Sequence, residues 1–217
     1  MKNSISRRNF IRTAGLSLAG AVVLCSGLGY AASLPPAIQT PEHTYGKESS
    51  MNKRILVTYA TCAGSTVEVA TAIAETLAKR GFSVDVKAVK TRPALSGYDA
   101  LVMGSAIRMG AWLPEAVSFI KDNQAALSGL PLALFTVHMS NLADDETSRA
   151  ARADYTAPLK AFVTPKDEAF FAGVMDYTKL SFLDGLIAKA VASQSHGPTG
   201  DQRDWSKISA WAQAVMA

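Results

Sequence analysis

The sequence contains few of the residues that build disulfide frameworks or metal centres. Its 217 residues include only two cysteines, Cys25 and Cys62, and three histidines, His43, His138 and His196. The histidines lie far apart and lack the short spacing of zinc ligands. These shortages exclude a disulfide scaffold and argue against a zinc enzyme, so we predict no metal site.

Excess charge of one sign is also absent from most of the chain. The formal net charge is +4, with 22 basic and 18 acidic residues. Lys2, Arg7, Arg8 and Arg12 are the only charged residues before Glu42, and without these four the charges balance. Nucleic-acid-binding proteins carry a basic surface. The rest of the chain, from residue 13 onward, is formally neutral and gives no support to nucleic acid as a partner.

Residues 1–31 have the composition of a targeting segment. Arg7 and Arg8 precede an uncharged stretch over 13–32 that is rich in glycine, alanine and serine, and small residues allow cleavage after Ala31. The segment resembles a twin-arginine signal peptide, whose export machinery carries proteins already folded. We therefore expect a periplasmic or other extracytoplasmic location. The alternative is a retained membrane anchor, because twenty uncharged residues can span a bilayer.

Residues 32–51 are expected to form a linker. The segment contains Pro35, Pro36 and Pro41 and has no hydrophobic periodicity. A self-contained domain is expected over residues 52–217.

This domain has the pattern of an α/β protein. With 48% hydrophobic and 18% charged residues in the whole chain, a normal core is available. Ile55-Leu56-Val57-Thr58-Tyr59 is typical of a strand buried on both faces. Residues 82–86 alternate between apolar and polar side chains, which also predicts a strand. Further strands are predicted over 98–103, 132–137 and 169–175, which gives five with 55–59.

Helical spacing of apolar residues separates most of these strands. It predicts helices over 66–80, 114–127, 146–163 and 204–216. Gly81 would end the first helix, Pro114 suits a first turn, and Asp204 is the expected N-cap of the last helix. The alternation predicts an α/β fold with a doubly wound, five-stranded parallel sheet and helices on both faces. Ligands of such sheets bind beyond the carboxyl ends of the strands.

The loop over residues 61–66 follows the first predicted strand and opens a helix. Backbone N–H groups and the helix dipole at such a turn attract an anion, and Thr61, Ser65 and Thr66 add hydroxyl donors. Gly64 permits a close approach of the backbone. The loop lacks GxxxxGK[ST] and GxGxxG, so a nucleotide triphosphatase and the usual dinucleotide fingerprint are disfavoured. The residues suit one phosphate monoester, or else an ordinary strand-to-helix turn.

The order Thr-x-x-Gly-x-Thr in this loop resembles the FMN phosphate loop of the flavodoxin-like family. The resemblance implies FMN as the cofactor. Ala63 replaces a hydroxyl residue that commonly precedes the glycine in that family. Cys62 is either a small buried residue or a thiol whose pKa is lowered by the helix N-terminus. The phosphate contacts that the resemblance implies come from Thr61, Cys62, Ala63, Gly64, Ser65 and Thr66.

Two further loops at the same edge are implied to hold the flavin ring. Trp112 could stack on the ring or pack at a helix start, and Arg108 could neutralise a reduced ring or be a solvated charge. His138 could exchange a proton or form a structural hydrogen bond. Arg108 and His138 are the candidate catalytic residues. The implied ring contacts are Ser105, Ala106, Ile107, Arg108, Met109, Gly110, Trp112, Thr136, Val137, His138 and Asn141.

Residues 53–216 are most similar to the menaquinone-dependent protoporphyrinogen oxidase branch of that family. The similarity rests on Gly104 to Gly110, on Phe171-Ala172-Gly173 and on Asp204-Trp205. It implies an oxidoreductase that passes electrons from a reduced donor through FMN to a quinone. An electron-transfer module with a redox partner protein and no substrate of its own is the alternative, although simple flavodoxins are strongly acidic and this body is neutral. A flavin-free interaction domain is a third possibility.

The segment 181–191 is amphipathic, and its apolar residues share one side: Phe182, Leu183, Leu186, Ile187 and Val191. This side could touch a membrane or an apolar substrate, or pack on the protein's own sheet.

Overall fold

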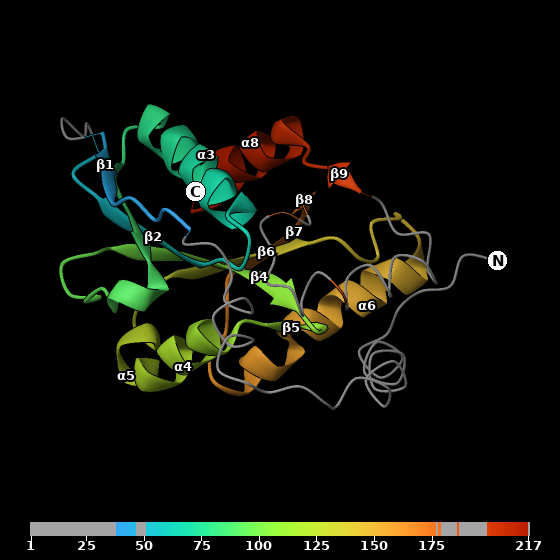
Figure 1. Ribbon diagram of the computed structural model, residues 1–217. Coiled ribbons are helices and arrows are strands. Elements are labelled where there is room, and N and C mark those ends of the chain that lie inside the picture. The colour runs from blue at the N-terminus through green and yellow to red at the C-terminus, as the bar shows by residue number, and fades with distance from the viewer. Residues whose placement is uncertain (1–37, 47–50, 177, 179–185, 187–198, 217) are drawn as a thin grey trace, which may run out of the picture.

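The computed structural model describes residues 38–46, 51–176, 178, 186 and 199–216 (Figure 1). The expected signal peptide over 1–31 and nearly all of the amphipathic segment 181–191 lie outside the described residues. Within the described part, no helix is long and apolar enough to cross a membrane.

A mixed sheet forms the centre of the molecule, and its five long strands are parallel, as predicted. The spatial order is β1-β3-β2-β4-β6-β7, and β5 pairs with β4. The chain places β3 on one side of β2 and then crosses to place β4 on the other side, which makes β2 and β4 the topological switch point. The strands are β1 His43–Tyr45, β2 Arg54–Ala60, β3 Ser83–Ala88, β4 Ala100–Arg108, β5 Ala111–Trp112, β6 Leu132–His138 and β7 Asp167–Ala172.

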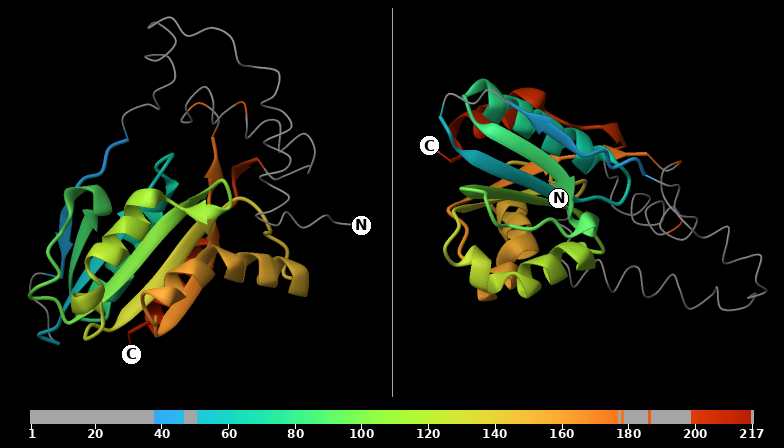
Figure 2. Two further views of the ribbon diagram at one scale, coloured as in Figure 1. Left: turned by 90° about the horizontal axis from the view of Figure 1, so that it is seen from below. Right: turned by 90° about the vertical axis from the view of Figure 1, so that its left-hand side faces the viewer.

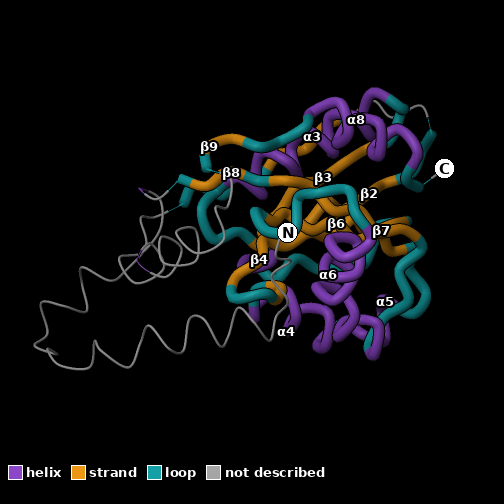
Figure 3. Tube along the Cα trace, turned by 90° about the vertical axis from the view of Figure 1, so that its right-hand side faces the viewer, coloured by secondary structure: helices purple, strands orange, loops and turns teal. Residues whose placement is uncertain are grey.

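Helices cover both faces of the sheet, which confirms the doubly wound arrangement (Figures 1 and 3). Helices α3 (Ser65–Lys79) and α8 (Trp205–Ala214) pack on one face. Helices α4 (Pro114–Asp122), α5 (Gln124–Leu127) and α6 (Glu146–Thr156) pack on the other. Because both faces are covered, every residue of β6 is buried.

The predicted helices are confirmed, with changes at their ends. The segment predicted as 114–127 is divided at Asn123, which is the C-cap of α4 and the N-cap of α5. The segment predicted as 146–163 ends as α6 at Thr156 and continues as a 3₁₀ turn over Ala157–Ala161. Between β3 and β4 the chain makes only a 3₁₀ turn, Val89–Thr91.

Strand β4 is longer than predicted and forms a hairpin with β5. The sequence predicts that this strand ends at residue 103 and that a loop follows, which is wrong, because Ser105 to Arg108 continue the strand. Met109 and Gly110 have φ values of 52° and 73°, the left-handed pair that a two-residue type I′ turn requires. Glycine is suited to that conformation, and the turn matches the twist of the two strands.

Two more differences concern short strands. The predicted strand 169–175 is interrupted at Gly173, after which β8 (Val174–Met175) pairs with β9 (Gly200–Asp201). Strand β1 lies inside the segment expected to be a linker and pairs antiparallel with β3. The ordered sheet therefore begins before residue 52.

Candidate functional site

The loops that follow β2, β4 and β6 meet at the carboxyl edge of the sheet (Figure 2). These are the residues after Ala60, the β4–β5 hairpin and the segment 139–145. The first two follow the strands of the switch point, where sheets of this kind leave room for a ligand. Two open hollows of about 500 and 530 Å³ lie at the opposite edge, where Pro131 and Lys166 line both. They do not include any residue of these loops.

The loop over 61–66 has the geometry of an anion site. Gly64 is the N-cap of α3 with φ 94°, and it has no side chain to cap the helix. Its amide donates to Thr61 Oγ1 over 3.0 Å, which leaves the Thr61 hydroxyl hydrogen for another acceptor. The first-turn N–H groups and the positive end of the α3 dipole therefore face the loop.

A buried hydroxyl at this loop needs a partner. Thr66 is fully buried, and Oγ1 has no hydrogen-bond partner among the residues that the structure describes. A buried polar group without a partner costs roughly 1–3 kcal/mol. The phosphate oxygens of FMN would supply the missing acceptor, so the residues present fit this group.

Gly173 brings β7 close to the same loop. A Cβ placed on Gly173 would lie 3.4 Å from Ser65 Oγ and 2.8 Å from Val137 Cγ1. Only a glycine leaves the Ser65 hydroxyl and the Val137 methyl group unobstructed. In the sequence, Gly173 is only one of the residues that carry the family similarity, because its place beside Ser65 depends on a contact over 108 positions.

The predicted ring contacts divide into exposed and buried residues. Ala106, Ile107 and Gly110 are partly exposed, and Arg108 and Met109 are exposed on the hairpin. These residues can meet a ligand from solvent.

Trp112 does not fit the stacking role proposed for it. Its side chain is 3% exposed, and the indole Nε1 donates to Thr136 Oγ1 over 2.9 Å. Ser105 is also buried, and its Oγ accepts from the Leu113 amide over 3.0 Å. Val137 is buried as well, so these residues belong to the packed interior and do not line an open surface.

His138 is also buried, at 4% exposure. Its Nδ1 lies 2.6 Å from the carbonyl oxygen of Ser140, and because a carbonyl only accepts, Nδ1 carries the hydrogen. Burial lowers the pKa of His138 to about 4. The hydrogen bond to Ser140 opposes this shift, and the charges of Arg152 and Lys207 add to it. The ring is therefore neutral at pH 7 and holds the start of the loop, which does not favour it as a general base.

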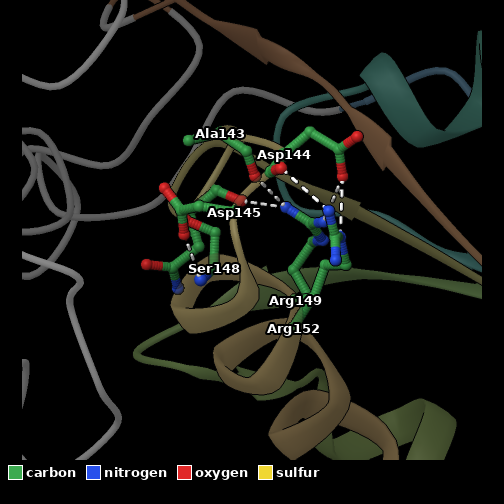
Figure 4. A network of polar contacts seen from close by, with 7 residues as sticks. Ala143, Asp144, Asp145, Ser148, Arg149 and Arg152 are labelled. Atoms are coloured by element: carbon green, nitrogen blue, oxygen red, sulfur yellow. Dashed lines mark hydrogen bonds and ion pairs between the residues drawn. The ribbon is translucent and has the colours of Figure 1, made fainter.

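The loop after His138 is fastened to α6. Figure 4 shows Arg152 and Arg149 directed at this loop, and Arg152 Nη1 donates to the carbonyl oxygens of Asn141 and Ala143 over 2.6 and 2.8 Å. Arg149 Nε donates to Asp144 Oδ1 over 2.9 Å. These hydrogen bonds hold the loop against α6.

Asn141 has a left-handed backbone, with φ 59°, and its Nδ2 donates to Tyr155 Oη over 3.0 Å. Asp145 caps α6 by accepting from the Ser148 amide over 2.7 Å. Asn141 is partly exposed, so it remains a candidate contact for a ligand.

A basic residue from the far end of the chain lies near the start of α3. Arg203 pairs with Glu68 in the first turn of α3 and with Asp201, and its guanidinium lies 4.5 Å above the Trp205 ring. Two carboxylates thus offset its charge. The described residues contain no group of three or more side chains that could hold a metal ion.

Comparisons with known proteins agree with the fold. The family profile described as "Flavodoxin domain" matches residues 56–202. The chain is 24% identical to protoporphyrinogen IX dehydrogenase (quinone) of Escherichia coli K12 over 172 residues, which cover 75% of this chain and 94% of the relative. It is also 24% identical to the Leishmania major protein of the same name over 180 residues, 78% of this chain and 77% of the relative.

Solved structures that the chain matches include two flavodoxins. A short-chain flavodoxin associated with a non-canonical PDU bacterial microcompartment has 17% identity and a TM-score of 0.42, and the match covers 66% of this chain and 99% of that one. Oxidised Flavodoxin 1 from Bacillus cereus has 16% identity and a TM-score of 0.42, with coverage of 64% and 97%.

Proposed function

Because the chain belongs to the flavodoxin domain family, we propose that it is an FMN-binding oxidoreductase that passes electrons from a reduced donor to a quinone. The observation that carries this proposal is the loop at 61–66. It combines a helix N-terminus whose N-cap, Gly64, has no side chain with the buried hydroxyl of Thr66, which has no hydrogen-bond partner among the described residues. Bound there, FMN would supply the one- and two-electron chemistry that amino acid side chains lack.

The residues divide between holding the phosphate and facing the ring. Thr61, Ser65 and Thr66 would donate hydroxyl hydrogens to the phosphate, and Gly64 would let it approach the α3 amides. The ring would lie against the exposed side of the β4–β5 hairpin and the residues after His138. Arg108, exposed there, would offset negative charge on a reduced ring.

The quinone and the location belong to the same proposal. The quinone is supported by the similarity to relatives named for it. A periplasmic location, with export by the twin-arginine machinery, is supported by Arg7 and Arg8 and by the uncharged stretch that follows them. Residues 181–191 would provide a peripheral membrane contact, which would suit a quinone dissolved in the membrane.

The first test is the visible absorption spectrum of the full chain, purified from the cytoplasm without added flavin. A flavin spectrum, with FMN released on denaturation, is expected. A colourless protein that also ignores added FMN would contradict the assignment. If FMN is bound but reduced protein is not reoxidised by quinone, the electron-transfer module is favoured instead.

Substitution of Gly64 tests the phosphate site directly. Gly64→Asp should abolish flavin retention, because its carboxylate would repel the phosphate. Among the described residues, a Cβ at this position meets Ile38 Cγ2 at 3.7 Å, so there is space for a side chain, but the φ of 94° strains any residue other than glycine.

Two controls separate charge from other effects. Gly64→Asn has the same shape without the charge and tolerates the left-handed backbone, so it should retain more FMN than Gly64→Asp. Gly129→Asp adds the same carboxylate at an exposed position, where a Cβ would meet nothing within 4 Å, and should bind FMN normally. Equal FMN affinity in Gly64→Asp and the unchanged protein would refute the phosphate assignment.

A further inference from the structure

The segment 38–46, the N-terminal arm, runs toward the phosphate loop. Its strand β1 pairs antiparallel with β3, in register Thr44 with Asp85. Since β3 is parallel to β2, the chain before His43 extends toward the carboxyl edge of the sheet, where the loop 61–66 lies. The arm and α3 lie on the same side of the molecule (Figure 1).

The beginning of the arm lies against the phosphate loop. The Cγ2 atom of Ile38 is 3.7 Å from the position that a Cβ would take on Gly64, which is van der Waals contact. Ile38 is partly buried, whereas its neighbour Gln39 is exposed. An apolar side chain is therefore placed beside the N-cap of α3, the point at which the helix would receive a phosphate.

The arm is fastened to the sheet by specific contacts. Thr44 Oγ1 donates to Asp85 Oδ1 over 2.7 Å. Asp85 is buried and also accepts from Tyr98 Oη over 2.6 Å and from Arg54 Nη2 over 2.9 Å. Three donors thus hold one carboxylate, and one of the three belongs to the arm.

The C-terminal end of the arm is also held in place. Tyr45 packs against the core on the α3 side of the sheet. Gly46 has φ 65°, and a Cβ there would lie only 2.2 Å from the Phe82 carbonyl oxygen, so the arm approaches β3 as only glycine permits. These contacts give the arm a defined course over residues that precede the predicted domain.

We propose that residues 38–46 form a strap beside the phosphate loop that slows the loss of FMN, with Ile38 as its positioning residue. This inference rests on the proposed function, because it concerns the same site. An isoleucine beside Gly64 would exclude water from the N–H groups that hold the phosphate, and hydrogen bonds to a charged group are stronger when water is excluded. Opening of the strap would then have to precede or accompany release.

Two variants and their conservative partners test the strap in the full chain. Ile38→Ser removes the apolar cover, and Thr44→Val removes the donor to Asp85 while keeping the shape of the side chain. Each should accelerate FMN dissociation roughly tenfold, measured from the fluorescence of released flavin after dilution. Ile38→Val and Thr44→Ser should restore slow release. Gln39→Ser, at the exposed neighbouring position, should leave the rate unchanged.

A second readout does not depend on dissociation rates. If closing of the strap favours FMN, then FMN must favour closing of the strap by the same factor. Saturating FMN should therefore slow amide hydrogen exchange at residues 43–45. Thr44→Val should lose most of this protection.

The possible outcomes distinguish a failure of the strap proposal from a failure of the proposed function. Failure of the unchanged protein to bind FMN refutes the proposed function. Normal FMN binding with the same dissociation rate in every arm variant, and no change in exchange at 43–45, refutes the strap alone. Faster FMN association with unchanged dissociation in Ile38→Ser would show that the arm obstructs the site, which also overturns the proposal.

Discussion

Lowering the pH below 7 should destabilise the folded protein through His138. The side chain is 4% exposed and packs against the rings of Tyr155 and Phe170, with centroid distances of 5.7 and 6.5 Å. Burial disfavours the charged imidazolium, and Arg152 and Lys207 add to this effect. Protonation would therefore cost more in the folded protein than in the unfolded chain.

The size and sign of the effect follow from the pKa of His138. It is lowered from 6.5 to about 4 in the folded protein, so between these values the unfolded chain binds more protons. Stability therefore rises with pH across this window and is fully present above the unfolded pKa. At about 1.4 kcal/mol per pKa unit, the loss on going from pH 7.5 to pH 4 is about 3 kcal/mol.

Urea denaturation between pH 7.5 and 4 measures this effect when the protein is compared with His138→Asn. The asparagine amide can take the place of Nδ1 toward the Ser140 carbonyl but does not titrate. The free energy of unfolding of the histidine protein should fall more steeply with pH than that of the variant. Carboxylates that titrate in the same range are common to both and cancel in the difference.

Parallel pH curves for the two proteins would refute this reasoning. An NMR titration of the His138 Hε1 resonance with a midpoint near 6.5 in the folded protein would refute it too. Either result would mean that water reaches the ring, and His138 would then regain its place as a candidate proton donor.

Two further predictions concern the core and the leader. Gly104→Ala should cost about 1–3 kcal/mol in denaturant unfolding, because its Cβ would lie 2.1 Å from Phe135 Cζ, whereas Gly129→Ala, with open space around its Cβ, should cost far less. Replacing Arg7 and Arg8 together by lysine should leave the protein in the cytoplasm on cell fractionation, because lysine does not reproduce the guanidinium geometry of a recognised arginine pair. Periplasmic accumulation of that variant would contradict export by this route.

Local signals were sufficient for most of the fold. Asp204 was predicted as an N-cap, and its carboxylate accepts from the Lys207 amide over 3.0 Å. Pro114 occupies the first turn of α4, as its fixed φ and missing N–H favour. These features are encoded within one turn of the chain. Most of the parallel strands were equally clear, because strands covered on both faces read as continuous apolar runs, whereas β3 was visible from its alternation.

The β4–β5 side of the candidate site was harder to predict, because its form depends on a tertiary contact. The apolar run of β4 stops at Met103, and the small residues after it resemble a loop. They continue the strand since Met109 and Gly110 turn the chain back, and Trp112 then packs in the core with its indole N–H bonded to Thr136. The burial of Trp112 therefore depends on a partner 24 positions away.

The edges of the domain depend on contacts of still longer range. The three residues of β1 are too short for a period of two to be visible, and Thr44 meets Asp85 across 41 positions. At the other end, Ile208 and Ala212 of α8 are fully buried beside α3, and Arg80 donates to the Ala212 carbonyl over 2.9 Å. The family profile ends at residue 202 and so excludes this helix. A chain trimmed to residues 56–202 would expose the core beneath α8 and lose the arm beside Gly64, so both flanks are parts of the folded unit.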